Sequence, residues 1–426
     1  DYKRYYEYGT LASKVLGFTG GDNQGIVGLE VSYESLLKGL DGSILTMATA
    51  GGVEIRNGAE DRKEPIAGWN LTTTLDLNVM EYATQVANKL LEQKQAKTVE
   101  IIIMNPQNGE IYAMVNAPEF DLNSPFEITG DTTSMTAKEK QDLRNQMWRN
   151  PCVSDTYEPG STFKILTSAA GIEKKVVTMN DHFFCPGYRI VEDRRIRCHK
   201  TTGHGSETFL QGIMNSCNPV FMDVGSRLGV HNFFEELNQF QLMKRTGIDL
   251  PGEAATIFHK EDKVGAVELA TISFGQSFQI SPVRLLASCS AIINGGTSVT
   301  PHVGVSTARE DGSYMKKFTY PGGSRVVSKE TSDQIREALG KVVSEGTGKN
   351  AGVEGYEVGA KTGTSQKLPR GNGKYIASTL AFAPVSKPEV ITLVRIDEPE
   401  GTYYGGTVAA PVVSQLYTNL LPYILK

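Results

Sequence analysis

The stretch YEPGSTFKI, from Tyr157 to Ile165, determines which fold the rest of the sequence is expected to adopt. Pro159 and Gly160 are typical of a turn that leads into a helix, and they place Ser161 at the start of that helix. Lys164 follows one helical turn later, on the same face. A serine hydroxyl becomes nucleophilic when a base takes its proton, and a lysine amine can be that base when burial or a nearby cation keeps it neutral. The stretch therefore predicts a Ser–Lys pair, although an N-capping serine beside a solvated lysine would show the same pattern.

Two later motifs supply groups that a Ser–Lys pair needs. In MNSCNPVF, Ser216 is suited to relaying a proton between Lys164 and a leaving group, and the Asn218 amide is suited to holding a peptide bond. In GAKTGTSQ, Lys361 brings a second ammonium group towards Lys164 and helps to keep it neutral, while Gly363 on an edge strand lets a substrate backbone lie close. Each motif alone also fits an ordinary turn or strand end, but the three in this order indicate one catalytic site.

The order of these motifs resembles the S-x-x-K, S-D-N and K-T-G set of β-lactamases and penicillin-binding proteins, with cysteine at position 217 where the set has aspartate. Over nearly its whole length the sequence is similar to class B penicillin-binding proteins, the monofunctional peptidoglycan transpeptidases. The segment FFCPGYRIVEDRRIRCHKTTGHG is similar to that of Gram-positive members, including sporulation-type ones. The other blocks that carry the resemblance are YEPGSTFK, NSCNPVF, SFGQSFQISPVRL, AIINGG and EGTGKNAGVEGYEVGAKTGT.

The resemblance implies a peptidoglycan D,D-transpeptidase that cross-links stem peptides through a serine acyl-enzyme and that β-lactams inhibit by acylating the same serine. It implies that Lys164 takes the proton of Ser161, that Ser216 passes a proton to the departing D-alanine, and that the backbone N–H groups of Ser161 and Thr364 form an oxyanion hole. No cofactor is expected for this chemistry. The residues implied in catalysis are Ser161, Lys164, Ser216, Asn218 and Lys361, and those implied in substrate binding are Thr362, Gly363 and Thr364.

Two other functions use the same motifs. A serine β-lactamase-type hydrolase would share the Ser–Lys pair but would release its acyl group rapidly to a bound water. A penicillin-binding scaffold or sensor of a wall-synthesis complex would keep the motifs while its role lay elsewhere. The length of the chain and the family blocks favour the transpeptidase over both alternatives.

The periodicity of apolar residues predicts an α+β fold. Asp76 is placed as an N-cap, and apolar residues recur at helical spacing over about residues 77–93. VEIIIM and EIYAMV flank an Asn-Gly turn, which predicts a hairpin. The simplest packing is an antiparallel sheet covered by the first and last helices, with a helical insertion between them, and the resemblance implies the penicillin-binding transpeptidase fold. Strands are expected over residues 99–104, 110–115 and 390–396 and from residues 356 and 375, and a final helix over about 407–421.

We expect two regions in the chain. Residues 1–68 resemble the end of the family's non-catalytic pedestal module and contain one short helix around residues 33–40, followed by a polar linker, NGAEDRKEPIAG, at 57–68. Residues 69–426 form the expected transpeptidase domain. Because family members begin with a cytoplasmic tail and one transmembrane helix, we expect that a membrane anchor has been removed. The resemblance then implies a location on the extracytoplasmic face of the bacterial membrane and a polytopic glycosyltransferase as partner.

A candidate metal site lies between the first two motifs. Cys185, Cys198 and His204 would converge if their segment folds as a loop or hairpin, and zinc favours four such ligands in a tetrahedron. Asp155, just before the Ser161 helix, is the first candidate for the fourth ligand, with His199 and His182 as further candidates. A structural zinc is one interpretation; a Cys185–Cys198 disulfide and unlinked thiols are the others. The Cys217 side chain is expected to point into the core, and Cys152 and Cys289 are expected to be small buried residues.

Composition excludes several other classes of protein. The 426 residues are 39% hydrophobic and 21% charged, which is ample for a folded core. The net charge of −5, without a basic stripe, argues against nucleic acid as a partner. No run of about 18 apolar residues is present. The partners that the family resemblance implies are peptidoglycan stem peptides and β-lactams.

Overall fold

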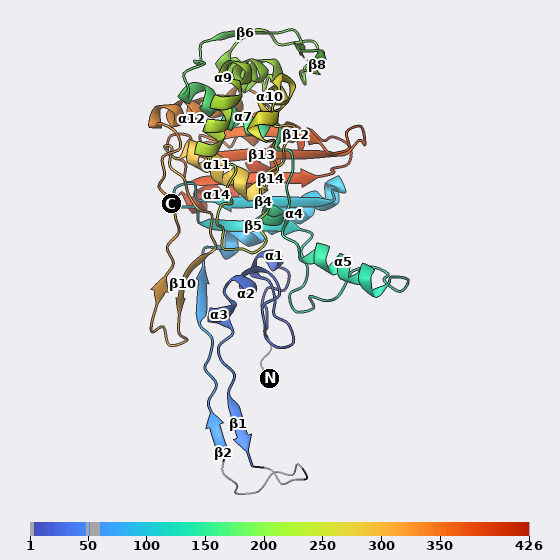
Figure 1. Cartoon of the computed structure of the whole chain (residues 1–426), viewed down its shortest axis with the longest axis vertical. Helices are drawn as coiled ribbons and strands as arrows, with labels where there is room; N and C mark the ends of the chain where they lie inside the picture. Colours follow the sequence, from blue (N-terminus) through green and yellow to red (C-terminus); the bar gives the residue numbers. More distant parts are fainter. Residues whose placement is uncertain (1–3, 48–50, 52–59, 426) are drawn as a thin grey trace.

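The computed structural model describes residues 4–47, 51 and 60–425, and an antiparallel sheet of five strands forms its centre (Figure 1). The spatial order of the strands is β12-β13-β14-β4-β5, which puts β12 at one edge. β4 and β5 form the predicted hairpin, and the three late strands lie where the sequence predicts them. The α+β fold is therefore confirmed. The strands of this sheet are β4 (Thr98–Met104), β5 (Ile111–Ala117), β12 (Gly359–Gln366), β13 (Tyr375–Ala383) and β14 (Val390–Asp397).

Helices cover both faces of the sheet. The first long helix, α4 (Leu77–Lys94), begins at Asp76, whose side chain accepts a hydrogen bond from the Val79 amide at 3.1 Å. The last helix, α14 (Ala410–Ile424), lies beside α4 on the same face, after the short α13 (Gly405–Val408). On the other face, α11 (Pro282–Ile293) packs against β14. The first and last helices thus cover the sheet as predicted.

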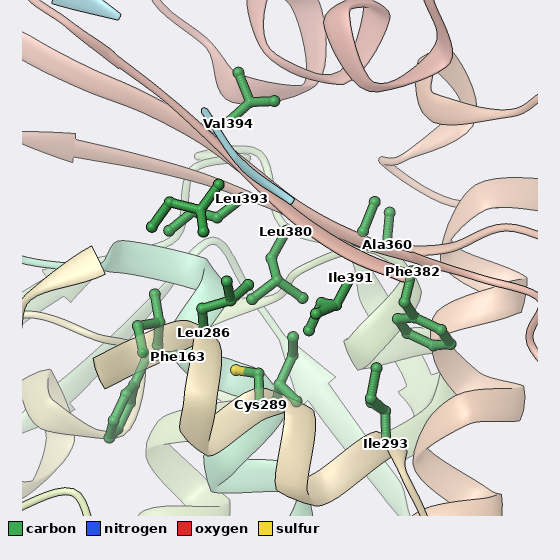
Figure 2. Packing of buried hydrophobic residues seen from close by; sticks show 14 of the residues in the cluster. Phe163, Leu286, Cys289, Ile293, Ala360, Leu380, Phe382, Ile391, Leu393 and Val394 are labelled. Atoms are coloured by element: carbon green, nitrogen blue, oxygen red, sulfur yellow. The ribbon is translucent and has the colours of Figure 1, made fainter. Parts of the chain in front are cut away.

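The core lies between α11 and the sheet (Figure 2). Leu286, Cys289 and Ile293 on α11 face Leu380 and other apolar residues of the strands, and all of them are buried. Burial of an aliphatic side chain of this size stabilises the fold by about 1.5–3 kcal/mol, so this layer stabilises the packing of α11 on the sheet. Cys152 and Cys289 are both fully buried, as expected.

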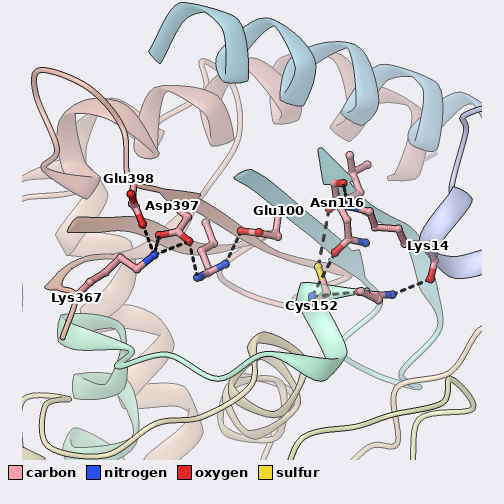
Figure 3. A network of polar contacts seen from close by, with 10 residues as sticks. Lys14, Glu100, Asn116, Cys152, Lys367, Asp397 and Glu398 are labelled. Carbon is pink, nitrogen blue, oxygen red and sulfur yellow. Dashed lines mark hydrogen bonds and ion pairs between the residues drawn. The ribbon is translucent and has the colours of Figure 1, made fainter. Parts of the chain in front are cut away.

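Charged residues are also buried, in a network on the same face of the sheet (Figure 3). Arg395 on β14 donates to Glu100 on β4 at 2.8 Å, and both side chains are almost inaccessible to solvent. Asp397 and Glu398 accept from Lys367 at 3.0 and 2.6 Å. These pairs tie the ends of β12, β14 and β4 together.

The helical insertion between β5 and β12 contains most of the remaining elements, and α7, α9, α10 and α12 gather beyond the β12 edge of the sheet (Figure 1). No helix among the described residues is both long and apolar enough to cross a membrane. The helices of the insertion are α5 (Ala137–Trp148), α6 (Pro151–Ser154), η1 (Gly160–Phe163), α7 (Lys164–Glu173), α8 (Phe209–Met214), α9 (Asn218–Gln239), η2 (Glu261–Lys263), α10 (Ala266–Ile272), α12 (Lys329–Ser344) and η3 (Lys349–Ala351). Its strands are β6 (His182–Cys185), β7 (Tyr188–Val191), β8 (Arg194–Arg197), β9 (Gly205–Thr208), β10 (Gly304–Ala308) and β11 (Lys316–Lys317).

The N-terminal region differs from the prediction in two details. The expected helix over residues 33–40 is only α3 (Glu34–Leu37), because Gly39 adopts a left-handed φ of +72°. Part of the expected linker is a strand, β2 (Glu60–Lys63), which pairs with β1 (Ser43–Thr46) in an arm that projects from the body (Figure 1). Residues 57–59 of that linker lie outside the described residues. The other N-terminal elements are α1 (Ser13–Leu16), α2 (Gly28–Ser32) and β3 (Asn70–Thr73).

The N-terminal region is fastened to the rest of the chain. β3 pairs with β10, which in turn pairs with β11. The Tyr33 hydroxyl donates to Asp249 Oδ2 at 2.6 Å, and the same oxygen accepts from the Gly304 amide at 2.6 Å. The division of the chain at residue 68 stays a prediction.

Candidate active site

The YEPGSTFKI turn lies directly against the edge strand of the sheet. Ser161 is in η1, and Lys164 is the first residue of α7. Gly160 has a φ of +57°, and a Cβ atom there would lie 2.9 Å from the Thr364 carbonyl oxygen. A Cβ atom on Gly363 would in turn lie 3.1 Å from the Pro159 carbonyl oxygen. The absence of two side chains therefore lets the serine turn and β12 approach each other, and Ser161 itself is partly exposed.

The three motifs meet at two buried lysines. Lys164 Nζ donates to the Ser216 carbonyl at 2.7 Å, to Asn218 Oδ1 at 2.7 Å and to Ser216 Oγ at 3.2 Å. Lys361 Nζ donates to the same Ser216 Oγ at 2.8 Å. Only 1% of Lys164 and 0% of Lys361 is exposed. The Ser216 hydroxyl is thus a bridge between two amines, and its residue takes a left-handed φ of +54° to make that bridge.

Burial perturbs both amines. Loss of hydration lowers the pKa of Lys164 to about 8, while the nearby thiols of Cys217 and Cys198 and the Glu207 carboxylate act in the opposite direction. Burial, and then the charge of Lys164, lowers the pKa of Lys361 well below its usual value. The sequence predicts that Lys361 helps to keep Lys164 neutral; in the structure, burial is the cause that lowers the pKa of Lys164, and the charge effect between the two lysines acts on Lys361. Two amines that share one hydroxyl titrate as a pair, so a neutral base is available near neutral pH.

β12 offers the binding edge that the sequence predicts. Its position at the end of the sheet leaves one side without a partner strand among the described residues. Thr362 is buried, while Thr364 is partly exposed and its hydroxyl accepts from the Gly405 amide at 3.0 Å. That bond leaves the Thr364 hydroxyl proton free to be donated to a ligand. An extended peptide beside β12 would therefore lie between this strand and Asn218.

A second cluster lies behind the Ser216 loop. The ligand atoms of Cys185, Cys198, His204 and Cys217 all lie within 4.8 Å of one another. All five cysteines of the chain lie among the described residues and carry free thiols, so no disulfide joins Cys185 to Cys198. The structure therefore brings together three of the predicted metal ligands.

The fourth predicted ligand is wrong. Asp155 forms an ion pair with Arg149 and is not in the cluster, whereas Cys217 is. Cys217 is fully buried in the core, as the sequence predicts. Its thiol lies there beside the ligand atoms of Cys185, Cys198 and His204, a neighbourhood that the sequence did not predict. The sequence did contain a signal for the fourth ligand. Of the other three cysteines, Cys217 is the closest in sequence to Cys185, Cys198 and His204.

Two buried carboxylates beside the site were not singled out from the sequence. Glu207 is buried beside the cluster, with Oε1 3.9 Å from His204 Nδ1 and Oε2 accepting from the Asn215 amide group at 3.0 Å. Glu158 is buried next to the serine turn and accepts from Arg370 at 2.8 and 3.0 Å. Glu158 lies inside the YEPGSTFKI stretch but was not singled out, because its partner Arg370 is 212 residues away in the chain. Glu207 is outside the motifs, and only the folded structure shows that it is buried beside the cluster.

The donor set of the cluster fits a zinc ion. Three thiols and one imidazole form a Cys₃His set, the kind that closes a tetrahedral structural site and leaves no open position. His199 approaches Cys198 Sγ to 3.8 Å but is not part of the cluster, and His182 is exposed on β6.

Comparisons with known proteins agree with this geometry. Residues 99–418 match the family model described as penicillin binding protein transpeptidase domain. Stage V sporulation protein D of Bacillus subtilis is 40% identical over 99% of this chain, and PbpB of Mycobacterium tuberculosis is 28% identical over 99%. The chain spans 64% and 62% of these two relatives. The crystal structure of penicillin-binding protein 3 from Mycobacterium tuberculosis with aztreonam superposes with a TM-score of 0.83 at 26% identity, covering 99% of this chain and 90% of that one.

Proposed function

The chain belongs to the penicillin-binding protein transpeptidase family, and from this membership we propose that it is a class B D,D-transpeptidase that cross-links peptidoglycan stem peptides. The observation that carries the proposal is the bridge from Lys164 through Ser216 Oγ to Lys361, beside the partly exposed Ser161 and the open edge of β12. The similarity of the fold to a penicillin-binding protein crystallised with aztreonam also supports it.

In the first step, Ser161 Oγ attacks the carbonyl carbon between the two terminal D-alanines of a donor peptide, and Lys164 takes the serine proton. A C–O ester bond forms and the C–N bond breaks. The departing amine of D-alanine receives a proton through Ser216. The negative oxygen of the intermediate faces the N–H groups of Ser161 and Thr364, which stabilise it.

In the second step, the amine of a neighbouring stem peptide attacks the ester carbonyl carbon. A new C–N bond forms, the bond to Ser161 Oγ breaks, and the amine proton returns to that oxygen through Ser216 and Lys164. Asn218 orients the donor peptide, while Lys361, Thr362 and Thr364 hold its terminal carboxylate beside Gly363. A β-lactam takes the donor's place and leaves Ser161 acylated, because no acceptor can displace it.

The test is the intact mass of the protein after incubation with penicillin. One adduct per chain is expected, and it must disappear in Ser161→Ala. Ser168→Ala, which removes a buried serine on α7 about one turn after Lys164, is the matched control. No adduct, or an adduct that survives Ser161→Ala, rejects the proposal. Rapid turnover of penicillin without a stable adduct would indicate the hydrolase instead.

The cysteine cluster supports a structural zinc. Cys185, Cys198, His204 and Cys217 would hold it, and the ion would supply a fixed cross-link between the 182–208 arm and the Ser216 loop. Elemental analysis is expected to find about one zinc per chain in the purified protein and much less in Cys198→Ala. Cys289→Ala, which removes a buried thiol elsewhere, is the control. Zinc near zero in the unmodified protein would contradict the assignment.

Family membership also supports a location and a partner. The chain is expected to act on the extracytoplasmic face of the bacterial membrane, next to a polytopic glycosyltransferase that supplies glycan strands. The 40% identity to a stage V sporulation protein favours a role in sporulation. Co-purification of the full-length protein with that glycosyltransferase tests the partner, and separation of the two in mild detergent would contradict it.

A further inference from the structure

The hairpin of β7 and β8 has one face that packs on the protein and one that does not. On the inner face, Val191 and Ile196 pack against the core, and Arg189 forms an ion pair with Asp223 of α9 at 2.5 Å. Side chains alternate along a strand, so the residues between these lie on the opposite face. That outer face consists of Tyr188, Ile190, Arg195 and Arg197.

The outer face is cationic. The Arg195 guanidinium lies over the Tyr188 ring, 3.8 Å from its centroid, and Ile190 beside it is 64% exposed. Arg197 is exposed, and neither Arg195 nor Arg197 has a carboxylate partner among the residues that the structure describes. Residues 188–200 contain five lysines and arginines against two acidic residues, in a chain whose net charge is −5. A local excess of positive charge on an acidic protein attracts an anionic ligand.

The hairpin is fixed to the rim of the active site. The backbone carbonyl of Arg197 accepts a hydrogen bond from the Asn218 side-chain amide at 3.3 Å. Cys198, the next residue, belongs to the same cluster as Cys217, which lies between the two catalytic residues of its motif. The Arg197 end of the hairpin therefore lies on the Ser216–Asn218 side of the site, and β8 lies beyond the β12 edge of the sheet in Figure 1.

The proposed reaction determines which of the two peptide substrates approaches from the Ser216–Asn218 side of the site. In the proposed reaction, the acceptor amine replaces the departing amine of D-alanine, so both use the same path and the same proton relay in opposite directions. That relay is the Ser216 hydroxyl. The donor occupies the β12 edge, and the acceptor must therefore reach the ester from the Ser216–Asn218 side, along the hairpin.

We propose that the outer face of the β7–β8 hairpin binds the acceptor stem peptide through its free carboxylates. Arg195 and Arg197 would pair with these carboxylates, since a guanidinium matches a carboxylate with two parallel hydrogen bonds. Tyr188 and Ile190 would contact the apolar atoms of the same peptide. The inference rests on the proposed transpeptidase function and names the surface on which that function selects its second substrate.

The test measures how the acyl-enzyme divides between an acceptor amine and water. The full chain is supplied with a D-alanyl thioester donor and either a tripeptide acceptor with free carboxylates or the same peptide with its carboxyls amidated. The Arg195→Gln/Arg197→Gln double variant is compared with Arg194→Gln. Arg194 lies on the same hairpin but on the other face, and its charge is already paired with Asp193. Penicillin acylation of the unmodified chain is measured first, because its failure rejects the proposed function rather than this surface.

The double variant is expected to lower the ratio of aminolysis to hydrolysis by roughly three- to tenfold for the carboxylate acceptor at low salt, as two exposed ion pairs would. The loss should shrink at high salt, where charges are screened, and should be much smaller for the amidated acceptor. Arg194→Gln is expected to keep the unmodified ratio. Equal losses for both acceptors, an unchanged ratio, or an equal loss of acylation would each overturn the proposal. Inhibition by a soluble polyphosphate with an unchanged ratio would assign the surface to a phosphate polymer and overturn it as well.

Discussion

Replacing Gly363 by alanine tests whether close contact between β12 and the serine turn is needed for acylation. The added Cβ atom would lie 2.7 Å from Ser378 Oγ on the neighbouring strand β13. On the side of the serine turn it would lie 3.0 Å from Thr162 Cγ2 and 3.1 Å from the Pro159 carbonyl oxygen, against about 3.4 Å or more for an ordinary contact. Relief of both contacts moves the turn by roughly half an ångström away from the strand. Because a misplacement of about 1 Å costs about 100-fold in rate, the acylation rate is expected to fall about tenfold. Overpacking of this kind also costs about 1–3 kcal/mol of stability.

The control for this prediction is Gly359→Ala on the same strand. Its Cβ atom would lie 2.4 Å from the Phe382 ring, so it strains the core without touching the serine turn. Both variants are expected to melt a few degrees lower than the unmodified protein. Only Gly363→Ala should acylate slowly when penicillin acylation is measured on the folded fraction well below the melting temperature. A normal rate in Gly363→Ala, or an equal loss in Gly359→Ala, would refute the reasoning.

Three further predictions concern the base, the buried charges and the N-terminal contact. Lys164 must be neutral to accept a proton, and burial lowers its pKa to about 8, so the acylation rate should rise with pH through about 8. A flat rate profile between about pH 6 and 9 would contradict the role of Lys164 as the base. Arg395→Met leaves Glu100 buried without its cation and should lower the free energy of unfolding, measured with denaturant, by about 3–5 kcal/mol. The double variant Glu100→Leu/Arg395→Met should recover most of this loss. An equal loss in both variants would contradict a stabilising role for the ion pair. Asp249→Ala removes the acceptor of Tyr33 and should speed amide hydrogen exchange in residues 28–37 but not in β12–β14, and uniform exchange would argue against a local contact.

The framework of the fold was predictable from local signals. The helix over α4 follows from Asp76 and a helical apolar period, and the β4–β5 hairpin follows from two apolar runs around Asn-Gly. These signals involve residues close together in the chain, where backbone preference and solvent exposure determine the outcome. The strand at 60–63 was missed because all of its residues are charged, so no apolar alternation marks it.

The candidate site was predictable in its members but not in its geometry. The motif order correctly brought Ser161, Ser216 and Lys361 into one region, yet the sequence could not show that burial, and not the charge of Lys361, lowers the pKa of Lys164. Burial depends on how α7 packs against β12 and the Ser216 loop, which are distant in the sequence. The wrong prediction of Asp155 as a metal ligand has the same origin. Its closeness to the serine turn in sequence does not determine which way its side chain points, and in the structure it forms an ion pair with Arg149.

The Ser216 loop links the buried lysines to the cysteine cluster. This link explains why the Ser-Cys-Asn motif can have a cysteine at its middle position, 217. Ser216 adopts a left-handed backbone conformation, which for a serine costs of order 1 kcal/mol and must be held by its surroundings. On one side, Lys164 bonds both the carbonyl and the hydroxyl of Ser216; on the other, Cys217 enters the buried set with Cys198. In the S-D-N form of the motif an aspartate occupies the middle position, so the loop can be held by other means. Here the thiol ties the loop to the 182–208 arm, and loss of Cys217 is therefore expected to disturb the proton relay although the thiol takes no part in the reaction.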